Sequence, residues 1–200
     1  DSQVFNYSGT IDNFVVPDGV TSLTIKVRGA QGGSVSTTCS ATGGLGAEMI
    51  GDFAVTPGES LMVLVGQQGL SNGSDAGGGG GSFVVGSGNT PLIIAGGGGG
   101  ATNNIRNCGS NLNGIDASIT TSGTASANGL VAGGTGGNGG GASSGSGGGG
   151  GGFFTDGTAG TGLANNNGKS FLHGGIGGTG NNNDFGGFGG GGAGWFTGGN

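Results

Sequence analysis

The residue types that carry out most enzyme chemistry are scarce in this chain. Its 200 residues include one histidine, two cysteines and ten Asp and Glu residues. A catalytic triad, a histidine-rich zinc site or a His–Cys pair would need His173, whose sequence neighbours suggest no orienting partner. The carboxylates are scattered singly, so paired acid–base catalysis is not indicated. The lone loop acids Asp156 and Asp184 leave open only an incidental calcium ion. We expect a structural or surface role for His173, no enzyme activity, no cofactor and no resident metal ion.

One short segment, Gly168-Lys169-Ser170, resembles the end of a phosphate-binding loop. That motif requires a glycine at position 163, where Leu163 stands, and neither a preceding strand nor a following helix is indicated. With four Lys and Arg residues and a net charge of −6, the chain has little with which to bind nucleic acid electrostatically. The longest aliphatic run, Leu61–Val65, is far shorter than the ~20 residues of a membrane span. We therefore expect no nucleic-acid partner and no membrane span.

Glycine dominates the composition, with 61 of 200 residues. Collagen is excluded because the chain has three prolines and no Gly-X-Y period. The two halves of the chain differ, since residues 1–100 contain 11 of the 12 valines. The first half can therefore build a hydrophobic core, and the second half is not expected to do so by itself.

The first half is patterned for β-strands. In Leu23–Val27 apolar residues alternate with polar ones, which is the signature of a half-buried strand. Glu48–Val55 and Ser60–Val65 are expected to form a hairpin through Thr56–Glu59, which contains a Pro-Gly turn. The other predicted strands are Phe83–Val85 paired with Leu92–Ala95 around residues 86–89, and two short ones at Val4–Tyr7 and Phe14–Val16. Short, regularly spaced strands predict a mainly β fold, a β-sandwich or jelly-roll with little or no α-helix.

The glycine runs lie directly against predicted strands instead of between domains. Examples are Gly77–Gly81 and Gly96–Gly100 in the first half and Gly147–Gly152 and Gly189–Gly192 in the second. Ordered glycine loses much backbone entropy and buries no side chain, so its stabilisation must come from backbone contacts. Extended helices with three residues per turn can supply them if they lie side by side and hydrogen-bond to each other. We predict a bundle of such polyglycine-type helices on the β scaffold; a disordered glycine tail is the alternative.

Several segments resemble a known extracellular region. Gly58–Gly69 (GESLMVLVGQQG), the order of Gly77–Gly81 before Leu92–Gly100, and the later Phe185–Gly192 block resemble the glycine-rich region of the anaplastic lymphoma kinase and leukocyte tyrosine kinase receptors. The opening, with Phe14–Val20 (FVVPDGV) before Arg28–Gly33 (RGAQGG), is similar to glycine-rich modules of bacterial secreted and surface proteins.

This resemblance implies a β scaffold that carries polyglycine helices and performs no catalysis. It covers roughly residues 1–100 and 130–198. Residues 101–128 have no clear counterpart, and no kinase, transmembrane helix or cysteine-rich neighbour is present in the 200 residues, so receptor signalling is not implied. We expect one module over residues 1–200: a β-rich scaffold at 1–100, a polar insertion at 101–128, and a part rich in polyglycine helix at 129–200.

Cys39 and Cys108 are the only cysteines and both lie in polar, loop-like surroundings. In an oxidising compartment they are expected to form a disulfide that ties the 101–128 insertion to the loop after the Leu23 strand. Closing so long a loop contributes roughly 4 kcal/mol in the chain-entropy model. Two free thiols are the alternative.

Aromatic residues of the second half lie beside glycine runs. They either cap and pad the glycine bundle or form an exposed tip that contacts a receptor, a glycan or a neighbouring subunit. The candidates for contact are Phe185, Phe188, Trp195 and Phe196. Asn6 and Asn72 begin Asn-X-Ser sequons and are candidate glycosylation sites.

The function expected from these observations is structural and adhesive. Low charge, few lysines and the predicted disulfide favour an extracellular or cell-surface location. We expect a non-enzymatic module that assembles with copies of itself into a surface fibre, through an edge strand such as Val4–Tyr7 or through stacked glycine-helix faces. The alternative is a ligand- or receptor-binding module, a surface or phage-type adhesin that recognises a protein or glycan.

Overall fold

The computed structural model describes residues 2–36, 40–102, 113–126, 129, 131–142, 147–161, 164–180 and 183–194. Its regular elements are six strands and two short 3-10 turns: β1 (Ile11–Val15), β2 (Ser22–Arg28), β3 (Glu48–Ala54), β4 (Ser60–Leu64), β5 (Ser82–Gly86), η1 (Ser87–Asn89), β6 (Thr90–Ala95) and η2 (Phe171–His173). The expectation of a mainly β fold with very little helix is confirmed. Neither helical turn in the described ranges is long or apolar enough to cross a membrane.

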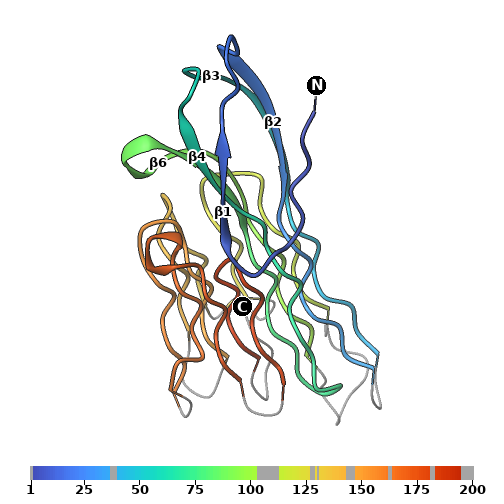
Figure 1. Ribbon diagram of the computed structural model, residues 1–200. Coiled ribbons are helices and arrows are strands. Elements are labelled where there is room, and N and C mark those ends of the chain that lie inside the picture. Colours follow the sequence, from blue (N-terminus) through green and yellow to red (C-terminus); the bar gives the residue numbers. More distant parts are fainter. Residues whose placement is uncertain are drawn as a thin grey trace.

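The strands form two antiparallel sheets. One has the order β1-β4-β5-β6 and the other contains β2 and β3 (Figure 1). The predicted pairing of Phe83–Val85 with Leu92–Ala95 is confirmed as the β5–β6 hairpin, whose register shifts between Val84 and Val85. Gly88 allows its tight connection because it has a φ of +65°, which favours glycine. β1 and β6 are therefore the two edges of the larger sheet.

Two strand predictions are wrong. Glu48–Val55 and Ser60–Val65 do not form a hairpin, because β3 pairs with β2 whereas β4 pairs with β1 and β5. The turn between them carries the chain from one sheet to the other, since Val16 donates to the carbonyl of Glu59 and accepts from Gly58. Val4–Tyr7 is not a strand, because no neighbouring segment pairs with it within the described ranges.

Charged side chains of β2 and β3 contact each other on the outer face of the smaller sheet. Glu48 accepts from Lys26 at 2.9 Å and also from Arg28 across the strand pair. These two hydrogen bonds hold the pKa of Glu48 below its usual value. Opposite charges on facing residues fix the register of an antiparallel pair. Glu48 is thus exposed, as expected, but it belongs to a cross-strand ion pair instead of a hairpin with β4.

The larger sheet is buried on both faces by two separate hydrophobic clusters. β5 shows this most clearly, because Val84 points into one cluster while Phe83 and Val85 point into the other. The first core lies between the two sheets and consists of Val16, Val27, Ala47, Val55, Leu61, Val63, Val84, Ile93 and Ala95. The second core consists of Leu64, Phe83, Val85, Phe153 and Phe171. Its two last members come from the glycine-rich second half, which therefore completes a core that the first half begins.

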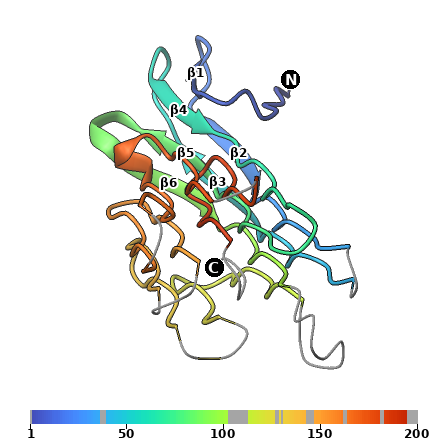
Figure 2. The same cartoon turned by 90° about the horizontal axis from the view of Figure 1, so that it is seen from below.

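Below the strands, the chain continues as extended segments that run side by side (Figures 1 and 2). The segment Gly77–Gly81 illustrates their packing, because its backbone is hydrogen-bonded to four other segments, around residues 30–33, 67–70, 98 and 187–192. A β-strand has room for only two neighbours in the plane of its sheet. The glycine segments are therefore joined in more directions than a sheet allows.

The hydrogen bonds between two such segments recur at every third residue. Gly33 and Ala30, for example, donate to Gly77 and Gly80, so both partners advance by three residues in opposite directions. The same step occurs in these pairs: Gly29 N with Ala47 O and Gly32 N with Gly44 O; Gly77 N with Leu70 O and Gly80 N with Gln67 O; Gly78 N with Gly192 O and Gly81 N with Gly189 O. Antiparallel strands repeat their backbone pattern every two residues, so this spacing is of another kind.

Candidate functional site

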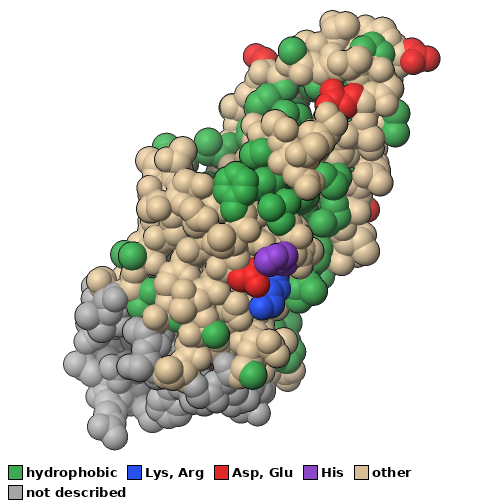
Figure 3. Space-filling model, turned by 90° about the vertical axis from the view of Figure 1, so that its left-hand side faces the viewer, with side chains coloured by type: hydrophobic (Ala, Val, Ile, Leu, Met, Phe, Trp, Pro, Cys, Tyr) green, Lys and Arg blue, Asp and Glu red, His purple; other side chains and the backbone are tan. Residues whose placement is uncertain are grey.

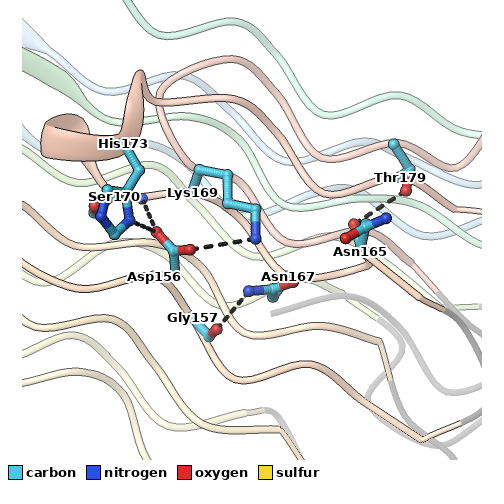
Figure 4. Close-up of polar contacts among 8 residues, drawn as sticks. All are labelled: Asp156, Gly157, Asn165, Asn167, Lys169, Ser170, His173 and Thr179. Carbon is cyan, nitrogen blue, oxygen red and sulfur yellow. Dashed lines mark hydrogen bonds and ion pairs between the residues drawn. The ribbon is translucent and has the colours of Figure 1, made fainter.

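A cluster of ionisable side chains surrounds Asp156 in the glycine-rich half (Figure 4). One carboxylate oxygen lies 2.8 Å from Nδ1 of His173 and accepts from the backbone N–H of Ser170 at 2.9 Å. The other oxygen lies 3.2 Å from Nζ of Lys169. In Figure 3 the single histidine lies beside one acidic and one basic side chain, with hydrophobic side chains gathered near them. Sequence analysis did not connect these residues.

The arrangement brings a serine, a histidine and an aspartate together, but Ser170 contributes its backbone N–H and not its hydroxyl, so the geometry is not that of a hydrolase. A serine nucleophile must be hydrogen-bonded to the histidine that takes its proton. Ser170 is fully buried, and within the described part of the chain its Oγ has no hydrogen-bond partner. His173 directs Nδ1 to Asp156, and Lys169 is held by the same carboxylate instead of facing an open phosphate site. The cluster acts as a clamp between the loop at residue 156 and residues 169–173.

The position of this clamp gives it a structural role. Phe153 precedes Asp156 by three residues, and Phe171 follows Ser170 directly in η2. The two rings stack with their centroids 5.3 Å apart and with an interplanar angle of 13°. Phe83 from β5 lies 5.4 Å from Phe171. The ionic contacts therefore hold together the two loops that place the second half of the chain on the larger sheet.

The carboxylate of Asp156 is ionised over most of the pH range. Burial alone raises its pKa, but the hydrogen bonds from Ser170, His173 and Lys169 outweigh burial and hold the pKa well below its usual range. A carboxylate whose pKa is lower in the folded than in the unfolded chain contributes stability above its unfolded value near 3.9. That contribution is lost as the pH falls below about 4.

We predict that Asp156→Asn lowers the free energy of unfolding by about 1–2 kcal/mol at pH 7, because it removes two charge-assisted contacts. The difference between wild type and variant should shrink as the pH falls from about 5 to 2, measured by urea unfolding at each pH. Asp18→Asn is the control, because Asp18 is exposed and its carboxylate has no partner in the part of the chain described here. Equal losses in the two variants would contradict a clamp at Asp156.

Two other acidic residues, Asp75 and Asp184, lie where glycine-rich segments meet. Asp184 is 3% exposed, and its Oδ1 has no hydrogen-bond partner among the residues that the structure describes. Burial raises the pKa of Asp184. Burial, followed by repulsion from Asp184, also raises the pKa of Asp75. Over the described ranges, no group of three or more His, Cys, Asp or Glu residues is arranged to hold a metal ion.

The predicted contact aromatics are only partly described. Phe188 packs against the second core, and its ring centroid lies 6.2 Å from that of Tyr7. The main chain at Phe188 also exchanges hydrogen bonds with Gln67, while the carbonyl of Phe185 accepts from Leu70. Both rings are half-buried. Trp195 and Phe196 lie outside the described residues.

The remaining predicted sites have mixed outcomes. Asn6 is exposed. Asn72 is exposed too, but its side-chain oxygen accepts from the backbone of Ser74 and Asp75, each at 2.8 Å, so the sequon forms a tight turn. Whether either sequon carries a glycan stays a prediction. Cys39 and Cys108 lie outside the described residues, and so does the predicted disulfide.

Two buried polar residues that sequence analysis did not single out join glycine segments to each other. Asn166 is buried, accepts from the backbone N–H of Gly160 and receives a backbone hydrogen bond from Ala193. Ser82 donates to the carbonyl of Arg28 at 2.6 Å and accepts from Gly66. No spacing in the sequence distinguishes them from the many exposed Asn and Ser residues.

No protein-family model and no curated protein matches this chain. The resemblance to the receptor glycine-rich region therefore stays a prediction.

Proposed function

We propose that this protein is a rigid, non-enzymatic structural and adhesive module of the cell exterior, in which a β-sandwich carries a bundle of polyglycine-type helices. The observation that carries the proposal is the packing of the glycine segments. They are mostly buried or half-buried, hydrogen-bonded at every third residue and joined to several neighbours at once. Three residues per turn is the repeat of the extended polyproline-type helix, which has no internal hydrogen bonds and so leaves its backbone groups free to bond to neighbours.

The glycines in these segments are required by the close approach of backbones. A Cβ atom on Gly80 would overlap the carbonyl oxygen of Phe188, and one on Gly32 would overlap that of Gly99. Similar overlaps recur throughout the bundle, with carbonyl groups as the obstacles. Since the main chain cannot swing aside as a flexible side chain can, only glycine fits. This supports an ordered bundle and argues against a flexible tail.

A rigid scaffold suits a structural role better than a catalytic one. The charged groups of the cluster around Asp156 are paired with one another. With 14 charged residues among 200, long-range electrostatic recognition has little to build on. A bundle bonded in several directions resists local opening, which suits a load-bearing or protease-exposed setting outside the cell.

Native-state hydrogen exchange tests the proposal. We expect amides of Gly77–Gly81, of Gly98 and Gly99, and of Gly186–Gly191 to be protected to a degree close to that of β4 and β5, because these amides donate hydrogen bonds to several segments. The exposed turn at residues 18–19 should exchange freely and serves as the internal reference. If the glycine runs exchanged as fast as that turn, the proposed bundle and the proposed rigid module would both be refuted.

A further inference from the structure

The two edges of the larger sheet differ in how they are protected. β6 carries Pro91, which has no N–H, and its pairing with β5 is interrupted by a register shift. Both features discourage another strand from adding to that edge. β1 has neither, and it pairs only with β4. The larger sheet therefore has one open edge.

The backbone groups that this edge presents can be assigned. Val16 donates to the carbonyl of Glu59, so it belongs to the set of residues whose main chain faces β4. Because the direction alternates along a strand, Ile11, Asn13 and Val15 direct their N–H and C=O groups away from the sheet. The side chain of Val15 is 60% exposed beside them.

The same chain holds an extended segment without backbone partners. Residues 2–7, which we call the N-terminal arm, make no hydrogen bond within the described ranges. The arm contains Val4, Phe5 and Tyr7, residue types that favour strands, and Val4 is 78% exposed. It is held by ring contacts, since Phe5 lies edge-on to Phe14 with centroids 6.1 Å apart and Tyr7 lies near Phe188.

We propose that the N-terminal arm of one copy pairs with the open edge of β1 in a second copy and so links copies of this protein together. This inference rests on the proposed structural function and names its partner. The lengths agree, because five residues of the arm span about 17 Å, the length of the five-residue β1. The arm has no charged residue, and the one acid in β1, Asp12, already accepts from Ser8 at 2.9 Å. Neither partner therefore opposes the pairing by like charge.

The local turn explains why the arm does not pair with β1 of its own copy. Ser8 and Thr10 are hydrogen-bonded to each other and to Asp12, and Gly9 between them has a φ of +77°. This fixes the direction in which the arm leaves β1 and brings Phe5 onto Phe14 without aligning the two backbones. An arm from another copy has no such constraint. It can replace the Phe5–Phe14 contact and add the backbone bonds that the arm and the edge both lack.

Two variants that each disable one partner test the proposal. Val15→Lys places a charge on the open edge and keeps the arm, whereas deletion of residues 1–7 removes the arm and keeps the edge. We expect the wild type to form dimers or longer chains from low to high micromolar concentration in size-exclusion chromatography with light scattering. Each variant alone should be monomeric, and an equimolar mixture should give a 1:1 heterodimer. Ile50→Lys, on an exposed residue of β3 in the other sheet, should assemble like the wild type.

The other outcomes would overturn the proposal in different ways. A wild type that stays monomeric at all concentrations refutes pairing between copies. Dimers of the deletion variant show that β1 pairs with β1 directly. If the deletion variant does not fold, Asn6→Pro and Tyr7→Pro replace it. In a paired strand alternate residues direct their N–H groups to the partner, so one of these two prolines must remove a backbone hydrogen bond between copies. If both proline variants still assemble, the arm does not pair with β1. Hydrogen exchange of the glycine runs is independent of all these results and separately decides the proposed function.

Discussion

Gly98→Ala should destabilise this protein by about 3 kcal/mol or more, although it adds a single methyl group. Gly98 is buried, and a Cβ atom there would overlap the carbonyl group of Gly44 and approach that of Leu45. Its N–H donates to Ala30 and its carbonyl accepts from Gly79, so the residue cannot withdraw without breaking bonds to two segments. For a chain of this size the change corresponds to a drop in Tm of about 6–12 °C, measured by differential scanning calorimetry.

Gly96→Ala is the matched control for this prediction because it lies in the same glycine run. A Cβ atom at Gly96 meets only the Cβ of Ala117, at an ordinary contact distance of 3.8 Å. Its φ is not in the left-handed region, so alanine should be neutral or stabilise by about 0.4–1 kcal/mol through the unfolded chain. A glycine run without fixed backbone contacts would tolerate both substitutions equally. Equal melting temperatures for the two variants would therefore refute the ordered bundle.

Much of the fold could be predicted from residues that are adjacent in sequence. The alternation in Leu23–Val27 and the turn glycines of the β5–β6 hairpin are local signals, and the structure confirms both. Which strands share a sheet is not a local property. The turn at Thr56–Glu59 has the composition of a hairpin, but the pairing of Val16 with Glu59 draws β4 to β1. No feature of the turn itself contains that information.

The segment Val4–Tyr7, wrongly predicted as a strand, also shows that strand pairing is not a local property. Its residues favour a strand, but a strand exists only where a neighbouring backbone accepts its hydrogen bonds. In one copy of the chain that neighbour is missing, because the turn at Ser8–Thr10 directs the segment elsewhere. The strand predicted from propensity is therefore wrong for the single chain.

The candidate site was less predictable than the fold. Asp156 lies 13 residues before Lys169 and 17 before His173. The sequence between them is rich in glycine and has no period that would relate the three residues. Their meeting depends on how the chain folds back between residues 156 and 169, which no local pattern encodes. The glycine runs, in contrast, predicted close backbone packing correctly in kind, because the absence of a side chain is itself a steric signal.

Phe153→Ala should release the glycine-rich second half from the larger sheet. Phe153 is buried, stacks on Phe171 and lies 6.5 Å from Phe83 of β5 between ring centroids. Removing it leaves a cavity in the second core and deletes a stacked pair, a loss of about 3–5 kcal/mol in the free energy of unfolding. Urea unfolding measures the loss. Hydrogen exchange should show it concentrated in residues 147–194, because β2 and β3 face only the first core.

Phe154→Ala is the neighbouring control and separates core packing from a general effect of removing a ring. The side chain of Phe154 is 50% exposed and meets Phe153 edge-on at 4.9 Å, so its loss should cost about 1 kcal/mol. A larger loss for Phe154 than for Phe153 would mean that the exposed ring, and not the stacked pair, attaches this half. If Phe153→Ala lowered protection equally in β2 and β3, the two cores would unfold as one unit. The expected contrast instead follows from the sheet itself, whose two faces alternate residue by residue between separate cores.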